Sequence, residues 1–141
     1  MYKIFITSLF FFIFSFPLKS EIVKELNIDG NSRISNETIK IYGKIELNKN
    51  YSENDLNQVI KNLYSTNFFE NITIELKNNI LKLNLKEYPI VNQLVIFGEN
   101  SNNYKKEIRK VIKLKEKSPF IKSFLAKDID IIKQLYSSAG Y

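Results

Sequence analysis

The chain has 141 residues, of which 21 are Lys or Arg and 15 are Asp or Glu, so its formal net charge is +6. It contains no His and no Cys, and therefore offers no imidazole base, thiolate nucleophile or soft metal ligand. This composition argues against an enzyme. We expect no catalytic, cofactor-binding or metal-binding residues.

The first 20 residues, "MYKIFITSLFFFIFSFPLKS", have the pattern of a targeting segment. Lys3 precedes an apolar run over 4–16, which Pro17 ends. The run is shorter than the roughly 20 apolar residues of a membrane-spanning helix, and its flanks are typical of a secretory signal. We predict a signal peptide over 1–20, with an uncleaved N-terminal anchor as the alternative.

The remaining residues, 21–141, hold 19 basic and 15 acidic side chains, because the predicted signal removes two of the 21 basic residues and no acid. A net charge of +4 is too mild for a dedicated nucleic-acid binder. An exported chain without Cys must be stabilised by core packing alone. Its length fits one ordinary domain or two small ones.

The next segments predict a strand followed by two helices. The strand candidate is "EIVKELNI" at 21–28, and "DGN" after it is a turn signal. A first helix is expected over 35–45 with Ser35 as its N-cap. A second is expected over 52–65, capped by Ser52, with one buried apolar stripe: Leu56, Val59, Ile60, Leu63 and Tyr64.

After the helices the apolar period changes from helical to two. Strands are predicted over 71–76 and 81–86, joined by a short loop, which makes an antiparallel hairpin. Residues 21–88 therefore read β-α-α-β-β, an α+β unit in which both helices cover one face of a three-stranded sheet. Parallel pairing of the first and last strands through the helical crossover places 81–86 centrally and 71–76 at an edge.

The pattern then restarts. "VNQLVIFG" (91–98) repeats "VKELNIDG" (23–30) at an offset of 68 residues, and the helix predicted over 126–137 matches "DLNQVIKNLYS" (55–65) at an offset of 72. A helix over 103–112 lies between them. The second unit, 90–141, thus lacks its last two strands, and we expect the chain to be the N-terminal fragment of a longer protein.

Three stretches carry a resemblance to a known family: "VKELNIDGNSRI" (23–34), "LYSTNFFENITIEL" (63–76) and "LKEYPIVNQLVIFGE" (85–99). They resemble the POTRA domains of the BamA family, which assembles β-barrels in the outer membrane. The likeness covers essentially all of 21–141. It implies tandem POTRA units, the first over 21–89 and an incomplete second over 90–141.

The resemblance also implies a function. It points to a non-enzymatic recognition part at the periplasmic face of a Gram-negative outer membrane. Its implied partners are unfolded outer-membrane proteins and the lipoproteins of the assembly complex. Two alternatives stay open: the POTRA arm of a two-partner secretion transporter, and a membrane-anchored POTRA scaffold or division protein.

The predicted edge strand is the candidate binding site. An unpaired strand can accept an extended peptide through main-chain hydrogen bonds with little demand on sequence. The alternative is an edge that Thr73, Glu75 and the nearby helix merely protect. The candidate peptide-binding residues are Asn71, Ile72, Thr73, Ile74, Glu75 and Leu76.

Other polar residues suggest less. Asp128 and Asp130 are interpreted as a solvated helix face, and Gly30 and Gly98 end strands singly without forming a phosphate-binding loop. Residues 103–117 hold seven Lys and Arg against two Glu. This stretch could meet anionic lipid headgroups or an acidic partner, or could be an ordinary exposed face.

Overall fold

The computed structural model describes residues 20–140. The predicted signal peptide therefore lies outside the described residues, except for Ser20. The elements in chain order are β1 (Glu21–Ile22), β2 (Glu25–Asp29), α1 (Asn36–Gly43), β3 (Asn50–Tyr51), α2 (Glu53–Ser65), β4 (Phe69–Lys77), β5 (Ile80–Glu87), α3 (Asn102–Val111) and α4 (Lys122–Ser138).

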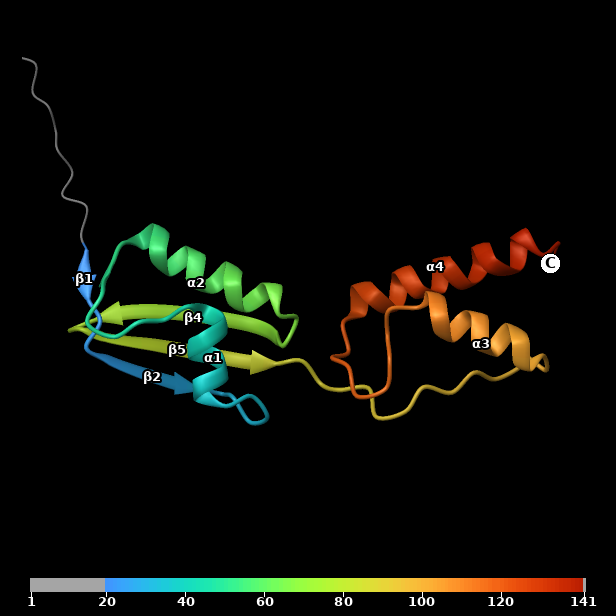
Figure 1. Ribbon diagram of the computed structural model, residues 1–141, viewed down its shortest axis with the longest axis horizontal. Coiled ribbons are helices and arrows are strands. Elements are labelled where there is room, and N and C mark those ends of the chain that lie inside the picture. The colour runs from blue at the N-terminus through green and yellow to red at the C-terminus, as the bar shows by residue number, and fades with distance from the viewer. Residues whose placement is uncertain (1–19, 141) are drawn as a thin grey trace, which may run out of the picture.

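The first part is the predicted mixed sheet covered by two helices. The strand order is β2-β5-β4, with β2 parallel and β4 antiparallel to β5. Figure 1 shows α1 and α2 together on one side of these strands. The α+β class and the central position of 81–86 are thus confirmed. The short pairing of β1 with β3 was not predicted.

The β4–β5 hairpin has a two-residue turn that sets its register. Asn78 and Asn79 both have positive φ, 54° and 66°, which two-residue hairpins require when the turn is of type I′. Asn tolerates this region better than most residues. The turn closes on the pair Lys77 and Ile80, and the pairs as far as Asn71 and Lys86 keep the register that it sets.

Both predicted N-caps are present in the first part. The Ser35 hydroxyl accepts a hydrogen bond from the Thr38 N–H, and Ser52 forms a reciprocal capping box with Asp55. Each bond satisfies a backbone donor that the first helical turn leaves unpaired. The caps explain why α1 and α2 start where the sequence predicts.

The core lies between the sheet and the two helices. The side chains of Leu63, Leu81 and Leu83 are fully buried, and Ile39 and Phe69 are almost so. The predicted stripe of α2 is largely correct, since Val59 and Leu63 are buried. Tyr64 departs from it, because 40% of its surface is exposed.

The second part differs from prediction at its first segment. No strand forms over 91–98. An isolated bridge joins Ile90 to Pro119, backbone bonds connect 89–91 with 117–120, and the backbone of Leu94 bonds to the side chains of Glu116 and Arg109. The physical reason is that a strand needs a paired neighbour. Within 20–140 no counterpart of β4 or β5 is available to this segment. The prediction of a strand over 91–98 is therefore wrong for this chain.

Helices α3 and α4 confirm the predicted helical segments, although α4 begins four residues before the expected 126. They enclose a small core that includes Ile108, Ile112 and Leu114. None of the helices within 20–140 has the length and apolar character needed to cross a bilayer.

Asp128 requires a correction. It was expected on a solvated face, but only 3% of it is exposed, whereas Asp130 is exposed as expected. The carboxylate of Asp128 accepts hydrogen bonds from the backbone N–H groups of Lys113 (2.7 Å) and Leu114 (2.8 Å). The loop after α3 brings these two N–H groups to Asp128 on α4. Their hydrogen bonds offset the cost of burying the carboxylate.

Candidate functional site

The candidate site is the free edge of strand β4. In the three-stranded sheet β4 has a neighbour on one side only, β5. Since Lys77 and Ile80 close a two-residue turn, they form a hydrogen-bonded pair, and such pairs alternate along an antiparallel ladder. The backbone groups of Ile72, Ile74 and Leu76 therefore point away from β5.

The start of this edge is capped by a helix residue. The Tyr64 hydroxyl, at the end of α2, accepts a hydrogen bond of 3.1 Å from the Ile72 N–H. This confirms the outward direction of that N–H and occupies it. Sequence reasoning placed Tyr64 in the buried stripe and missed this role. The sequence offered one indication of this role. Tyr64 stands eight residues before Ile72, close to the turn that joins the helix to the strand.

The end of the edge is open. Across the described part of the chain, no hydrogen bond reaches the outward N–H groups of Ile74 and Leu76. Their side chains are half-buried against the core, so the strand is held in place while its edge stays free. The candidate residues thus divide into a capped stretch around Ile72 and an open stretch from Ile74 to Leu76.

The backbone groups of Asn71, Thr73 and Glu75 point toward β5 and belong to the ladder. Thr73 pairs with Asn84, and its side-chain oxygen accepts a 3.3 Å hydrogen bond from the Asn84 amide nitrogen. Glu75 pairs with Lys82 and is exposed on the sheet face away from the helices. Asn71 follows an irregularity in the register between Phe69 and Asn71, so the edge is bent at its start.

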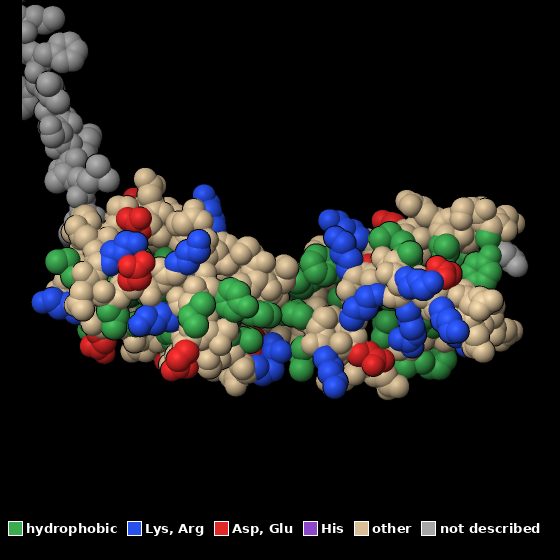
Figure 2. Space-filling view, in the orientation of Figure 1, with side chains coloured by type: hydrophobic (Ala, Val, Ile, Leu, Met, Phe, Trp, Pro, Cys, Tyr) green, Lys and Arg blue, Asp and Glu red, His purple; other side chains and the backbone are tan. Residues whose placement is uncertain are grey.

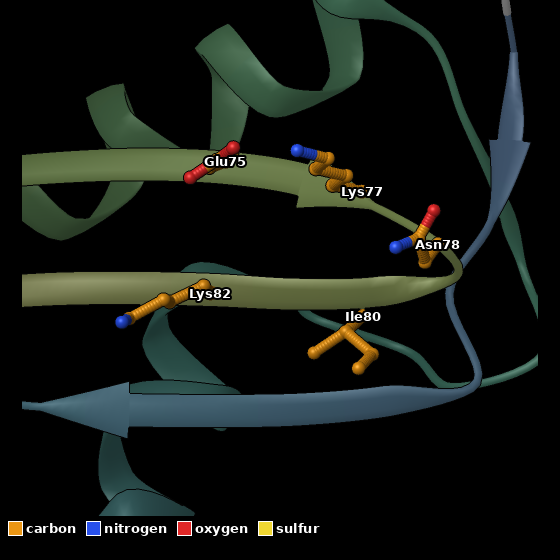
Figure 3. A pocket seen from close by; sticks show the side chains of 5 residues that line it. All are labelled: Glu75, Lys77, Asn78, Ile80 and Lys82. Atoms are coloured by element: carbon orange, nitrogen blue, oxygen red, sulfur yellow. The ribbon is translucent and has the colours of Figure 1, made fainter.

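A shallow hollow lies beside the open stretch on the sheet face. Figure 3 shows its lining side chains on β4, the turn and β5: Glu75, Lys77, Asn78, Ile80 and Lys82. Its volume of about 180 Å³ is below the ~300 Å³ at which small-molecule pockets usually begin. The hollow thus offers room for side chains of a bound strand better than for a separate ligand.

The far end of the sheet is closed by a charged junction. The Glu87 carboxylate, with a side chain only 6% exposed, pairs with the Arg33 guanidinium at 3.0 Å. It also accepts from the backbone N–H groups of Ser32, Arg33 and Ile34. Arg33 in turn donates to the Tyr88 carbonyl at 2.7 Å. The loop after β2 is therefore fastened to the chain that leads into the second part.

This junction changes the acidity of Glu87. Burial raises the pKa of the Glu87 carboxyl, but the hydrogen bonds from Ile34, Ser32 and Arg33, and the charge of Arg33, outweigh it. The pKa of Glu87 therefore lies below its ordinary value, and the residue is ionised at neutral pH.

An apolar groove of about 610 Å³ lies in the second part. It is lined mainly by residues 89–94 together with Leu114, Phe120 and Leu125. Residues 91–94 of this lining belong to the segment that forms no strand.

Comparisons with known proteins agree with this architecture. The family model described as "POTRA: Surface antigen variable number repeat" matches residues 89–141. The outer membrane protein assembly factor BamA of Neorickettsia risticii (strain Illinois) is 32% identical over 87 residues, which are 62% of this chain. BamA of Neisseria meningitidis serogroup B is 26% identical over 76 residues, or 54% of this chain. The chain spans only 12% and 10% of the lengths of these relatives.

Solved structures share the fold at low identity. The N-terminal domain of Omp85 from Thermosynechococcus elongatus matches with a TM-score of 0.57 at 13% identity, over 85% of this chain and 52% of that one. POTRA1-3 of the periplasmic domain of Omp85 from Anabaena matches with a TM-score of 0.55 at 12% identity, over the same shares. Residues 89–141 thus match the POTRA family model, 87 residues of the chain are similar to BamA, and the fold is that of the Omp85 POTRA structures.

Proposed function

We propose that this chain is the periplasmic recognition part of an outer-membrane β-barrel assembly protein, and that it binds client chains by strand addition at the β4 edge. The coarser role, in outer-membrane protein assembly, is supported by the POTRA match over residues 89–141 and by the similarity to BamA. The observation that carries the finer proposal is the pair of outward, unbonded N–H groups at Ile74 and Leu76.

Strand addition suits the open stretch physically. A client strand would meet the outward backbone groups of β4 and extend the sheet by one strand, so affinity would come from the main chain. Unfolded β-barrel proteins differ in sequence but share extended, alternating segments. A binding mode with little demand on sequence fits such clients, and the shallow hollow at Glu75 and Lys82 would accept some of their side chains.

The proposal extends to organisation, partners and location. Residues 1–20 would be a signal peptide, 21–89 the first POTRA unit, and 90–141 a second unit without its last two strands. The partners would be nascent outer-membrane proteins and lipoproteins of the assembly complex. The place of action would be the periplasmic face of the outer membrane, and the role would be binding without catalysis.

A proline substitution tests the edge. The Thr73 N–H belongs to the ladder with β5, so proline there would break the sheet, whereas the Ile74 N–H points outward. We expect Ile74→Pro to lower the binding of a fluorescent ten-residue peptide of alternating Val and Thr between Lys ends, measured by anisotropy. Ile74→Ala, which keeps the N–H, is the matched control.

A second arm is independent of folding. N-methylation of alternate peptide bonds in the same probe removes its edge donors and leaves the protein unchanged. Two probes are compared, one N-methylated at the odd-numbered and one at the even-numbered peptide bonds. We expect one of the two probes to lose binding. Equal binding of both methylated probes, or of a folded Ile74→Pro chain, would contradict strand addition at β4.

A further inference from the structure

Within residues 21–141, the net positive charge is confined to the second part. Residues 21–89 contain nine Lys and Arg against ten Asp and Glu, a net charge of −1. Residues 90–141 contain ten Lys and Arg against five Asp and Glu, a net charge of +5. Two copies of one repeat therefore differ by six charges, which an unselective Lys-rich composition does not explain.

Helix α3 gathers much of this charge on one face. At 100° per residue, its four cations fall within an arc of about 140°, and Ile108, which is buried, lies outside that arc. The loop that follows adds further exposed cations. The basic surface consists of Lys105, Lys106, Arg109, Lys110, Lys113, Lys115 and Lys117. Figure 2 shows blue side chains crowded over this half of the molecule.

Little of this charge is neutralised. Among the described residues of the second part, the ion pairs include one only, between Lys110 and Glu107 at 2.7 Å. Arg109 donates to the Leu94 carbonyl, and Lys113 lies 5.3 Å from the centre of the Phe124 ring. These contacts orient the two side chains without cancelling their charges. The basic surface is therefore available to an external anion.

Exposed apolar side chains lie on the segment to which Arg109 of the basic surface is bonded. Phe97 is 88% exposed and Val95 is 48% exposed. At the repeat offset of 68 residues, their counterparts in the first part are Asp29 and Asn27. The first part thus has polar groups at the positions where the second exposes a large aromatic ring to water.

We propose that this surface docks on an anionic lipid membrane, with the cations on headgroup phosphates and Phe97 entering the boundary with the acyl chains. Each Lys near an anionic bilayer strengthens binding through electrostatic attraction, and apolar groups beside it bury area in the interface. An acidic protein surface would match the cations but would leave Val95 and Phe97 against polar groups. The combination of both features favours lipid.

The test is flotation of the full chain with vesicles of phosphatidylcholine containing phosphatidylglycerol, and with vesicles of phosphatidylcholine alone. A triple variant removes Lys106, Lys110 and Lys113 by substitution with Gln. Its matched control removes Lys24, Lys40 and Lys61 of the first part in the same way, for an equal change in net charge. All variants keep residues 1–20, so any binding through that segment is common to them.

We expect the chain to prefer the anionic vesicles and the triple variant to bind them on the order of 100-fold more weakly at low salt, while the matched control stays near the parent. Phe97→Ser should weaken the binding that persists at high salt. Three results would overturn the proposal. These are equal binding to neutral and anionic vesicles, equal losses of binding in both triple variants, or binding to soluble polyglutamate that is as tight as binding to the vesicles and is unchanged by Phe97→Ser.

Discussion

The hydroxyl of Tyr64 lies 3.1 Å from the backbone nitrogen of Ile72, so helix α2 caps the beginning of the edge strand. The corresponding Tyr136 in the second copy has another role. Its hydroxyl donates to the Glu99 carboxylate, and its ring stacks on Tyr104 with centroids 5.6 Å apart. The same residue in the same repeat position thus protects an edge in one unit and joins helix to loop in the other.

Removal of the Tyr64 hydroxyl should expose one more position of the edge. In Tyr64→Phe the Ile72 N–H loses its partner, and we expect its hydrogen exchange, followed by NMR, to become faster than in the parent. The cost in the free energy of unfolding should be about 1 kcal/mol, as for one hydrogen bond. Tyr42→Phe, on an exposed ring of α1, is the control and should leave Ile72 unchanged. Unaltered exchange at Ile72 would show that the hydroxyl does not protect it.

The Glu87 junction should make the first part sensitive to acid. Because the pKa of Glu87 is lowered in the folded chain, the carboxylate stabilises the fold above its unfolded pKa of about 4.3, and this stabilisation is lost as pH falls through the folded value. We expect Glu87→Gln to lower the free energy of unfolding at neutral pH by about 1–3 kcal/mol and to weaken its pH dependence in acid.

Urea unfolding at a series of pH values measures this effect. Glu70→Gln is the control, since Glu70 pairs with Lys86 at 2.7 Å but is 44% exposed. An exposed pair contributes at most about 1 kcal/mol. If both variants lose the same stability and keep the same acid dependence, the buried junction has no special role.

Gly30 should tolerate no side chain. Its φ is +86°, and a Cβ built there would lie 2.0 Å from the Leu85 carbonyl oxygen, so β2 and its loop could not stay against β5. We expect Gly30→Ala to destabilise the first part by at least about 2 kcal/mol in thermal unfolding. Gly98→Ala is a matched control with φ +82° and no atom within 4 Å, and it should cost about 1 kcal/mol. If both variants lost the same stability, the positive φ alone would account for the effect at Gly30, and the close approach to the Leu85 carbonyl would contribute nothing.

Local patterns in the sequence sufficed for most of the first part. The change of apolar period from helical to two located α2, β4 and β5, and the caps at Ser35 and Ser52 located two helix starts. The need for a crossover between parallel strands placed β5 in the centre. These features depend on neighbouring residues and on simple chain connectivity, which a single sequence displays.

The errors concern residues whose state depends on distant partners. Asp128 alternates with apolar positions like any surface residue, and only the path of the loop at 113–114 brings two free N–H groups to it. The segment 91–98 has the alternating pattern of a strand. A strand forms only when its backbone pairs with a neighbouring strand, and the pattern alone does not supply that neighbour.

The sequence by itself determined the β-α-α-β-β order, the repeat and the excess of cations in the second copy, because periodicity and composition are local properties. Only the tertiary structure decided that Tyr64 caps Ile72 while Ile74 stays open, and that Glu87 fastens a loop more than 50 residues away. Those relationships are hydrogen bonds between groups that meet only when the chain has folded, so no spacing along the chain reveals them.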